Sequence, residues 1–92
     1  MSRPLHELQL RAGVLAQVPE ALRMECIGIA RDKSPSAAFD LASIAAHKHG
    51  IGGMQATGVA KATRWLAMIR RDYGEDIFNQ AARTFAAPTP TT

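Results

Sequence analysis

Four of the chain's eleven Lys and Arg residues lie in one short stretch, where their spacing suits anion binding. Lys61, Arg64 and Arg71 recur at intervals that place them on one side of an α-helix, with Arg70 at its edge. No acidic residue interrupts them before Asp72. Such a surface can hold the phosphates of a nucleic acid, and each contact would add salt dependence. The alternatives are an acidic protein partner, or a solvated helix face whose last arginines complement the helix dipole.

Residues 39–66, FDLASIAAHKHGIGGMQATGVAKATRWL, resemble a helix-turn-helix unit. In this interpretation Ala46 faces the second helix, Gly50 makes the turn, Ile51 fills the angle and Val59 anchors the second helix. The alternative is a pair of packed helices joined by a glycine-rich corner, which any all-α domain can contain.

The resemblance implies that the second helix would contact DNA. Gln and Thr side chains can reach base edges, and Lys and Arg can also hold phosphates. His49 stands where such a unit buries an aliphatic residue, and Gly52 and Gly53 stand at the start of the recognition helix. The residues expected to contact nucleic acid or a partner are Gln55, Thr57, Lys61, Arg64, Arg70 and Arg71.

Other chemistry-bearing residues do not form a catalytic or metal-binding set. His47 and His49 are two positions apart and point to different sides of a helix, and the lone Cys26 lies among apolar residues. Glu75 and Asp76 are adjacent and suit a helix start. We therefore expect no enzyme activity, no metal, no cofactor and no small-molecule substrate.

The basic cluster needs a helix to position it, and residues 54–73 show the longest helical periodicity. The expected inner stripe of this helix is Val59, Ala62, Leu66, Ile69 and Tyr73.

Capping signals divide the rest of the chain into further helices. A first helix should end near Gln17, a second should start at Pro19, and a third should start at Ser34 or Pro35. Gly50 and Gly74 are expected to be left-handed caps at the ends of the third and fourth helices. The expected inner residues of the third helix are Ala37, Leu41, Ile44 and Ala45, and those of the last helix are Ile77, Phe78, Ala81, Ala82 and Phe85.

The fold prediction is therefore all-α, a compact array or bundle of about five short helices. One domain should span residues 1–87, and residues 88–92 should be a disordered tail. On the first helix, Leu10 and Val14, followed by Val18, would form a dimer or partner face, unless the second helix covers them.

Length, charge and cysteine usage narrow the function. The chain has 92 residues, a formal net charge of +3 and one cysteine, with no apolar run long enough for a membrane span. We expect a cytoplasmic, non-catalytic binding protein, namely a DNA-associated regulator bound to double-stranded DNA. The alternatives are a phage- or plasmid-type inhibitor that blocks a host protein or nucleoprotein complex, as anti-CRISPR proteins do, and a homodimerisation module.

Overall fold

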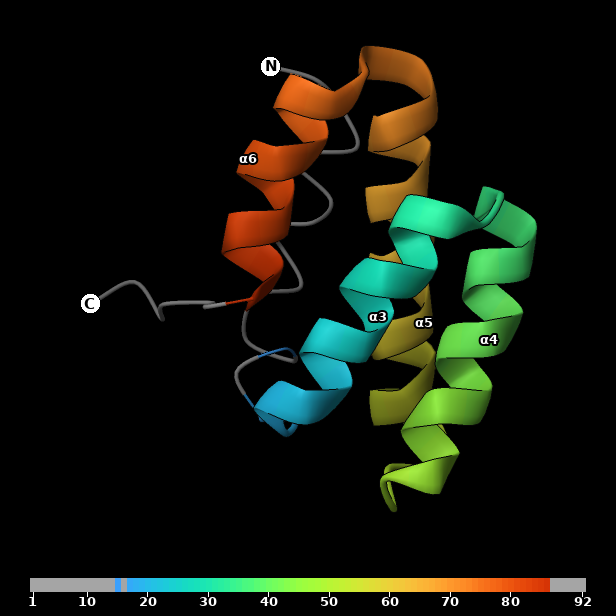
Figure 1. Ribbon diagram of the computed structural model, residues 1–92. Coiled ribbons are helices and arrows are strands. Elements are labelled where there is room, and N and C mark those ends of the chain that lie inside the picture. The colour runs from blue at the N-terminus through green and yellow to red at the C-terminus, as the bar shows by residue number, and fades with distance from the viewer. Residues whose placement is uncertain (1–14, 16, 87–92) are drawn as a thin grey trace.

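Helix α5 (Gly53–Tyr73) is the central element of the structure, a computed structural model that describes residues 15 and 17–86. It packs against each of the other helices, α3 (Glu20–Asp32), α4 (Pro35–Lys48) and α6 (Glu75–Ala86). Figure 1 shows α3 and α4 in front of α5, and α6 beside them. The all-α prediction is confirmed, since the described residues form four helices and no strand. Most of the expected first helix and the expected tail lie outside the described residues.

The helix boundaries follow the capping residues of the sequence. Ser34 is the N-cap of α4, and its hydroxyl accepts a hydrogen bond from the Ala37 N–H at 3.3 Å. Pro35 follows in the first turn, where a missing N–H costs no helical hydrogen bond. Gly74 ends α5 with a φ of 88°, and its N–H donates to the Arg70 carbonyl at 3.1 Å. These caps are therefore where the sequence predicts them.

The corner between α4 and α5 is a Schellman motif. Gly50 has a φ of 81°, a conformation that favours glycine, and its N–H donates to the His47 carbonyl at 3.0 Å. The Ile51 N–H donates to the Ala46 carbonyl at 2.9 Å, and the Ile51 side chain packs against the core. Both contacts are those expected when an αL glycine ends a helix. Gly52 then serves as the N-cap of α5 and Gly53 is its first residue, so the glycine pair marks the start of this helix and does not interrupt it.

Helices α4 and α5 form an antiparallel hairpin. In Figure 1, α4 descends from green to yellow-green, and α5 rises from olive to orange. In a helix-turn-helix unit the two helices meet at about 90–120°. Because α4 and α5 run antiparallel instead, the prediction of such a unit at residues 39–66 is corrected. The reason lies in the small side chains of both helices, which permit contact along their length. Their buried alanines are Ala38, Ala42, Ala45 and Ala46 on α4 and Ala56, Ala60, Ala62 and Ala67 on α5.

Three large side chains expected in the core are exposed instead. On α4, Leu41 is 37% exposed and Ile44 is 57% exposed, because the alanine stripe of this helix faces inward. Tyr73 is 47% exposed, since it is the last residue of α5 before the chain turns into α6. The largest fully buried side chains all lie outside α4: Phe78, Phe85, Leu15, Leu22, Leu66, Ile69, Val59, Thr63 and Cys26.

One arginine joins the two ends of the described chain. Arg23 Nη1 donates to the carbonyls of Leu15 and Val18, the first of these at 3.0 Å. Its Nε donates to the Ala86 carbonyl at 3.2 Å. A single guanidinium thus connects the segment before α3 with the end of α6.

Candidate nucleic-acid interface

Four of the predicted contact residues share one side of α5. At 100° per residue, Thr57, Lys61, Arg64 and Arg71 fall within one quadrant of the helix. Thr57 and Arg71 are exposed, whereas Lys61 and Arg64 are half-buried. We call these four residues the polar stripe.

The Arg64 guanidinium is stacked on an aromatic ring of α4. It lies over the Phe39 ring, 5.2 Å from the ring centroid, a distance at which the positive charge is attracted to the π-face. Phe39 is itself half-buried and packs against the core, so the ring is held in place. Stacking restricts Arg64 and leaves the N–H groups at the guanidinium edge available for a phosphate.

Lys61 lies within one turn of Arg64. Neither side chain makes an ion pair with a described residue. Thr57, one turn further back, donates its hydroxyl to the Gly53 carbonyl at 3.3 Å, which leaves the hydroxyl oxygen as an acceptor. The positive charge of the stripe is therefore concentrated at Lys61 and Arg64.

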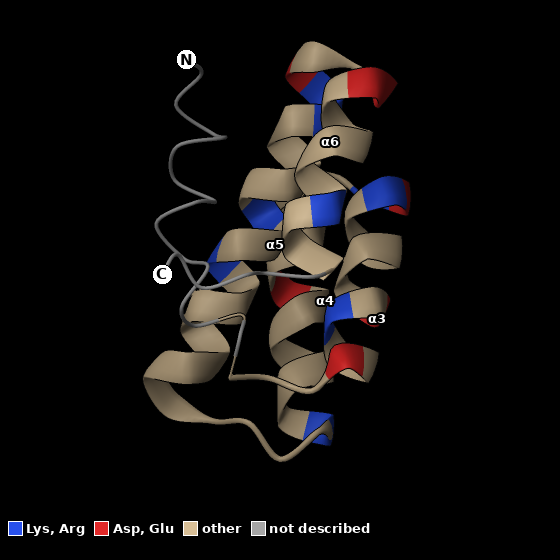
Figure 2. Ribbon diagram, turned by 90° about the vertical axis from the view of Figure 1, so that its left-hand side faces the viewer, with Lys and Arg blue, Asp and Glu red and all other residues tan. Residues whose placement is uncertain are grey.

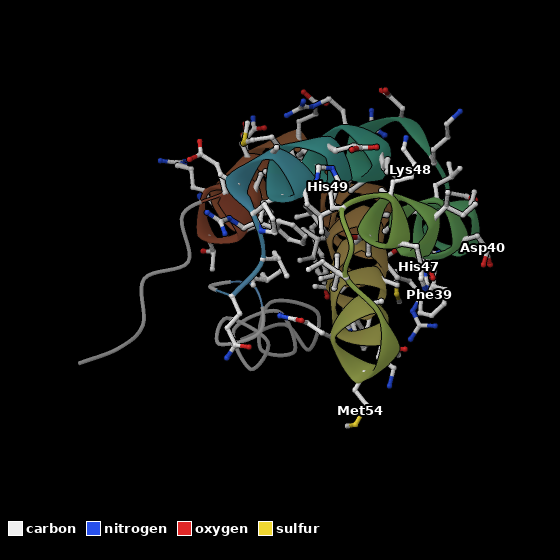
Figure 3. The ribbon with its side chains drawn as sticks, turned by 90° about the horizontal axis from the view of Figure 1, so that it is seen from below. Phe39, Asp40, His47, Lys48, His49 and Met54 are labelled. Carbon is white, nitrogen blue, oxygen red and sulfur yellow. The ribbon has the colours of Figure 1, made fainter. Side chains whose placement is uncertain are left out.

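His47 of α4 adds a further polar group on the side where Phe39 lies, as Figure 3 shows. Its Nδ1 lies 2.7 Å from the Ser43 carbonyl. A carbonyl only accepts, so Nδ1 carries the proton and Nε2 is left to contact solvent or a ligand. Lys48 and His49 lie on the opposite side, where His49 Nε2 is 3.2 Å from Glu25 Oε1 of α3.

Gln55 and Arg70 do not belong to the polar stripe. Gln55 lies nearly half a turn from Thr57 and shares a side with the buried Ala62 and Leu66. Arg70 points towards α6, where its Nε lies 3.7 Å from Glu75 Oε1. Gln55 was predicted as a contact residue from the helix-turn-helix resemblance, and Arg70 was predicted to lie at the edge of the basic side.

Arg71 is partly neutralised by its neighbour. Its Nε donates to Asp72 Oδ1 at 2.9 Å. This hydrogen bond raises the pKa of Arg71 and lowers the pKa of Asp72. The far end of the stripe therefore carries less net charge than its centre.

A surface hollow of about 330 Å³ lies beside Arg70 and Arg71, where α3 meets α4. The other residues that line it are Asp32, Lys33, Ser34, Pro35 and Ala67.

The predicted dimer or partner face lies mainly outside the described residues, which do not include Leu10 and Val14. Val18 is buried, and its carbonyl accepts a hydrogen bond from Arg23. The dimer or partner face, and its alternative of cover by the second helix, both stay predictions.

Cys26 is buried, as the sequence predicts, and burial raises the pKa of its thiol from 9.0 to about 11. A hydrogen bond with Thr63 opposes this shift, and the charge of Glu25 adds to it. The thiol therefore stays protonated at neutral pH, which makes it a poor nucleophile.

Residues 15 and 17–86 lack two kinds of feature, a metal-binding cluster and a membrane-spanning helix. These residues contain no group of three or more His, Cys, Asp and Glu side chains that could hold a metal ion. Within the same part of the chain, no helix has the length and apolarity needed to cross a membrane.

Comparisons with known proteins identify no relative of this chain, so the site is interpreted from its own geometry. No protein-family model matches the chain, and neither a curated protein nor a solved structure is significantly similar to it.

The residue that sequence reasoning missed is Phe39, because only the pairing of α4 with α5 brings its ring under Arg64. No local signal in the sequence specifies that pairing.

Proposed function

We propose that this protein is a non-catalytic, DNA-associated regulator that holds backbone phosphates with the polar stripe of α5. The observation that carries the proposal is the pair Lys61 and Arg64, which share one helical turn without an ion pair to any described residue. The stacking of Arg64 on Phe39 supports it, because a preordered guanidinium loses less entropy when it binds an oxyanion.

The geometry favours phosphate contact over base reading. The stripe follows the length of α5 from Thr57 to Arg71, a rise of roughly 21 Å at 1.5 Å per residue. Gln55, the side chain best suited to an adenine edge, lies on another side of the helix. Contacts of this kind position a protein on the duplex and carry little sequence information.

The test is fluorescence anisotropy with labelled duplex and single-stranded DNA over a series of salt concentrations. Wild type is compared with Lys61→Ala/Arg64→Ala. The slope of log K against log salt is negative, and removing two phosphate contacts should reduce its magnitude on duplex DNA by about 1.8. Circular dichroism confirms that the variant is folded.

The matched control is Arg31→Ala/Arg83→Ala, which removes the same charge from α3 and α6. It should leave the salt slope near the wild-type value. If wild type binds neither DNA at moderate salt, or if both double variants lose the same slope, the polar stripe is not a phosphate-binding surface.

A second candidate function is the inhibition of a host protein or nucleoprotein complex. The observation that favours it is the exposure of large apolar side chains, since Ile44 on α4 and Met54 at the glycine corner both face solvent. Figure 3 shows Met54 projecting from the start of α5. Affinity capture from host lysate should then recover one stoichiometric complex with wild type and lose it with Ile44→Asp/Met54→Asp. Recovery of DNA alone by both proteins would favour the first function.

A further inference from the structure

A groove with a volume of about 410 Å³ lies on the surface between α3 and α6, and it has no part in the proposed DNA contact. Its floor is apolar, because Ile27 and Ala82 are both buried there. Met24 stands at its side with 52% of its surface exposed, although it is a large apolar residue. The residues that line the groove are Met24, Ile27, Arg31, Asn79, Ala82, Arg83 and Ala86.

The charged side chains that line the groove are both arginines, one from each helix. Arg31 of α3 lies over the Phe78 ring, 5.3 Å from its centroid. Arg83 of α6 donates from Nε to the Asn79 carbonyl at 3.4 Å. Neither arginine makes an ion pair with a described residue, and no acid lines the groove. Figure 2 shows α3 and α6 next to each other, with basic segments in blue on both.

From these observations we infer that the groove binds an amphipathic α-helix of a partner protein, with an apolar stripe flanked by acidic residues. A helix placed between two neighbouring helices buries its apolar side chains against both of them. The stripe would cover Met24 and the groove floor, and the acidic flanks would face Arg31 and Arg83 across the rim. A nucleic acid does not fit as well, because its backbone would place charged phosphates over an apolar floor.

The probes are two designed peptides of about 18 residues, which form a helix about 27 Å long. Both carry the same leucine stripe, with glutamates on its flanks in one peptide and lysines in the other. Their binding to the 92-residue protein is measured by fluorescence anisotropy. We expect the glutamate peptide to bind at least about tenfold more tightly than the lysine peptide, a difference of about 1.4 kcal/mol.

Three variants locate and check the contact. Met24→Asp places a charge at an exposed position of the groove wall and should weaken the glutamate peptide by about tenfold or more. Arg31→Glu/Arg83→Glu should reverse the preference, so that the lysine peptide binds better. Lys61→Ala/Arg64→Ala should leave both affinities unchanged, which separates this result from the test of DNA binding.

Some outcomes would overturn the inference. These are that neither peptide binds, that both bind equally, or that Met24→Asp binds like wild type.

Discussion

The two sides of α5 are packed by opposite means. Towards α4, the contact is made by small side chains, since every buried residue of α4 is an alanine. Towards α3 and α6, the core contains large side chains such as Leu22, Leu66, Phe78 and Phe85. The central helix α5 therefore has one interface made of small side chains and another made of large ones.

The difference shows that extensive contact and stabilisation are separate properties. An alanine buries only a methyl group, so the α4–α5 hairpin gains little apolar burial from each residue despite its length. A buried phenylalanine removes far more apolar area from water. We therefore expect the interface with α6 to contribute most of the free energy of unfolding. The interface with α4 should be the least tolerant of larger side chains.

The largest expected effect is the loss of a large side chain. Phe78→Ala should lower the free energy of unfolding by about 3–5 kcal/mol, because it leaves a cavity in the core and removes the ring under Arg31. Urea denaturation measures the change. Phe39→Ala, at a half-buried ring of α4, is the control and should cost clearly less; equal losses would contradict the proposed division.

The next largest effect is a loss of stability at high pH. It tests the burial of Cys26, which α3 contributes to the core of large side chains. Because burial raises the pKa of Cys26 from 9.0 to about 11, the folded state holds its thiol proton where the unfolded state loses it. Its contribution to stability is complete below pH 9 and falls as the pH rises towards 11, by about 1.4 kcal/mol for each pKa unit. Urea denaturation over about three pH units, from roughly pH 8 to pH 11, should show a shallower decline in stability for Cys26→Ala than for wild type.

Added volume tests the alanine interface. Ala42→Leu should destabilise the protein by about 1–3 kcal/mol, because α4 must move away from α5 to accept it. The matched control is Ile44→Ala on the exposed side of α4, which should change stability by less than about 0.5 kcal/mol. If thermal denaturation showed a larger loss of stability for Ile44→Ala than for Ala42→Leu, Leu41 and Ile44 would face the core.

The smallest effect concerns the corner that closes the hairpin. Gly50→Ala should cost about 1 kcal/mol, because alanine is strained at a φ of 81°. Gly28→Ala inside α3 is the control, since an added Cβ there has no atom within 4 Å. It should instead raise stability by about 0.5–1 kcal/mol through helix propensity. Equal effects of the two substitutions on the melting temperature would contradict the role of Gly50.

The helices of the described chain could largely be predicted, because local chemistry specifies their ends. Ser34 supplies a side-chain acceptor, and Gly50 and Gly74 can adopt left-handed conformations, so these signals act within a few residues. The inner face of α4 could not be predicted in the same way. Both the alanine stripe and the pair Leu41 and Ile44 have helical spacing, and only packing against α5 decides between them.

The same limit applies to the candidate site. Helical spacing was enough to place Thr57, Lys61, Arg64 and Arg71 on one side of α5. It did not predict the stacking on Phe39, which depends on the alignment of two helices. Nor did it predict that Arg70 pairs with Glu75, which requires the turn into α6.

The hydrogen bonds of Arg23 affect the order in which tertiary contacts can form during synthesis. Its hydrogen bond to the Ala86 carbonyl joins α3 to the end of α6, 63 positions further along the chain. Helices α3, α4 and α5 all precede Ala86 in the order of synthesis, so this connection forms only after the residues of all three have been added. Until then Arg23 can donate only to the Leu15 and Val18 carbonyls, so α3 lacks this contact with the end of α6.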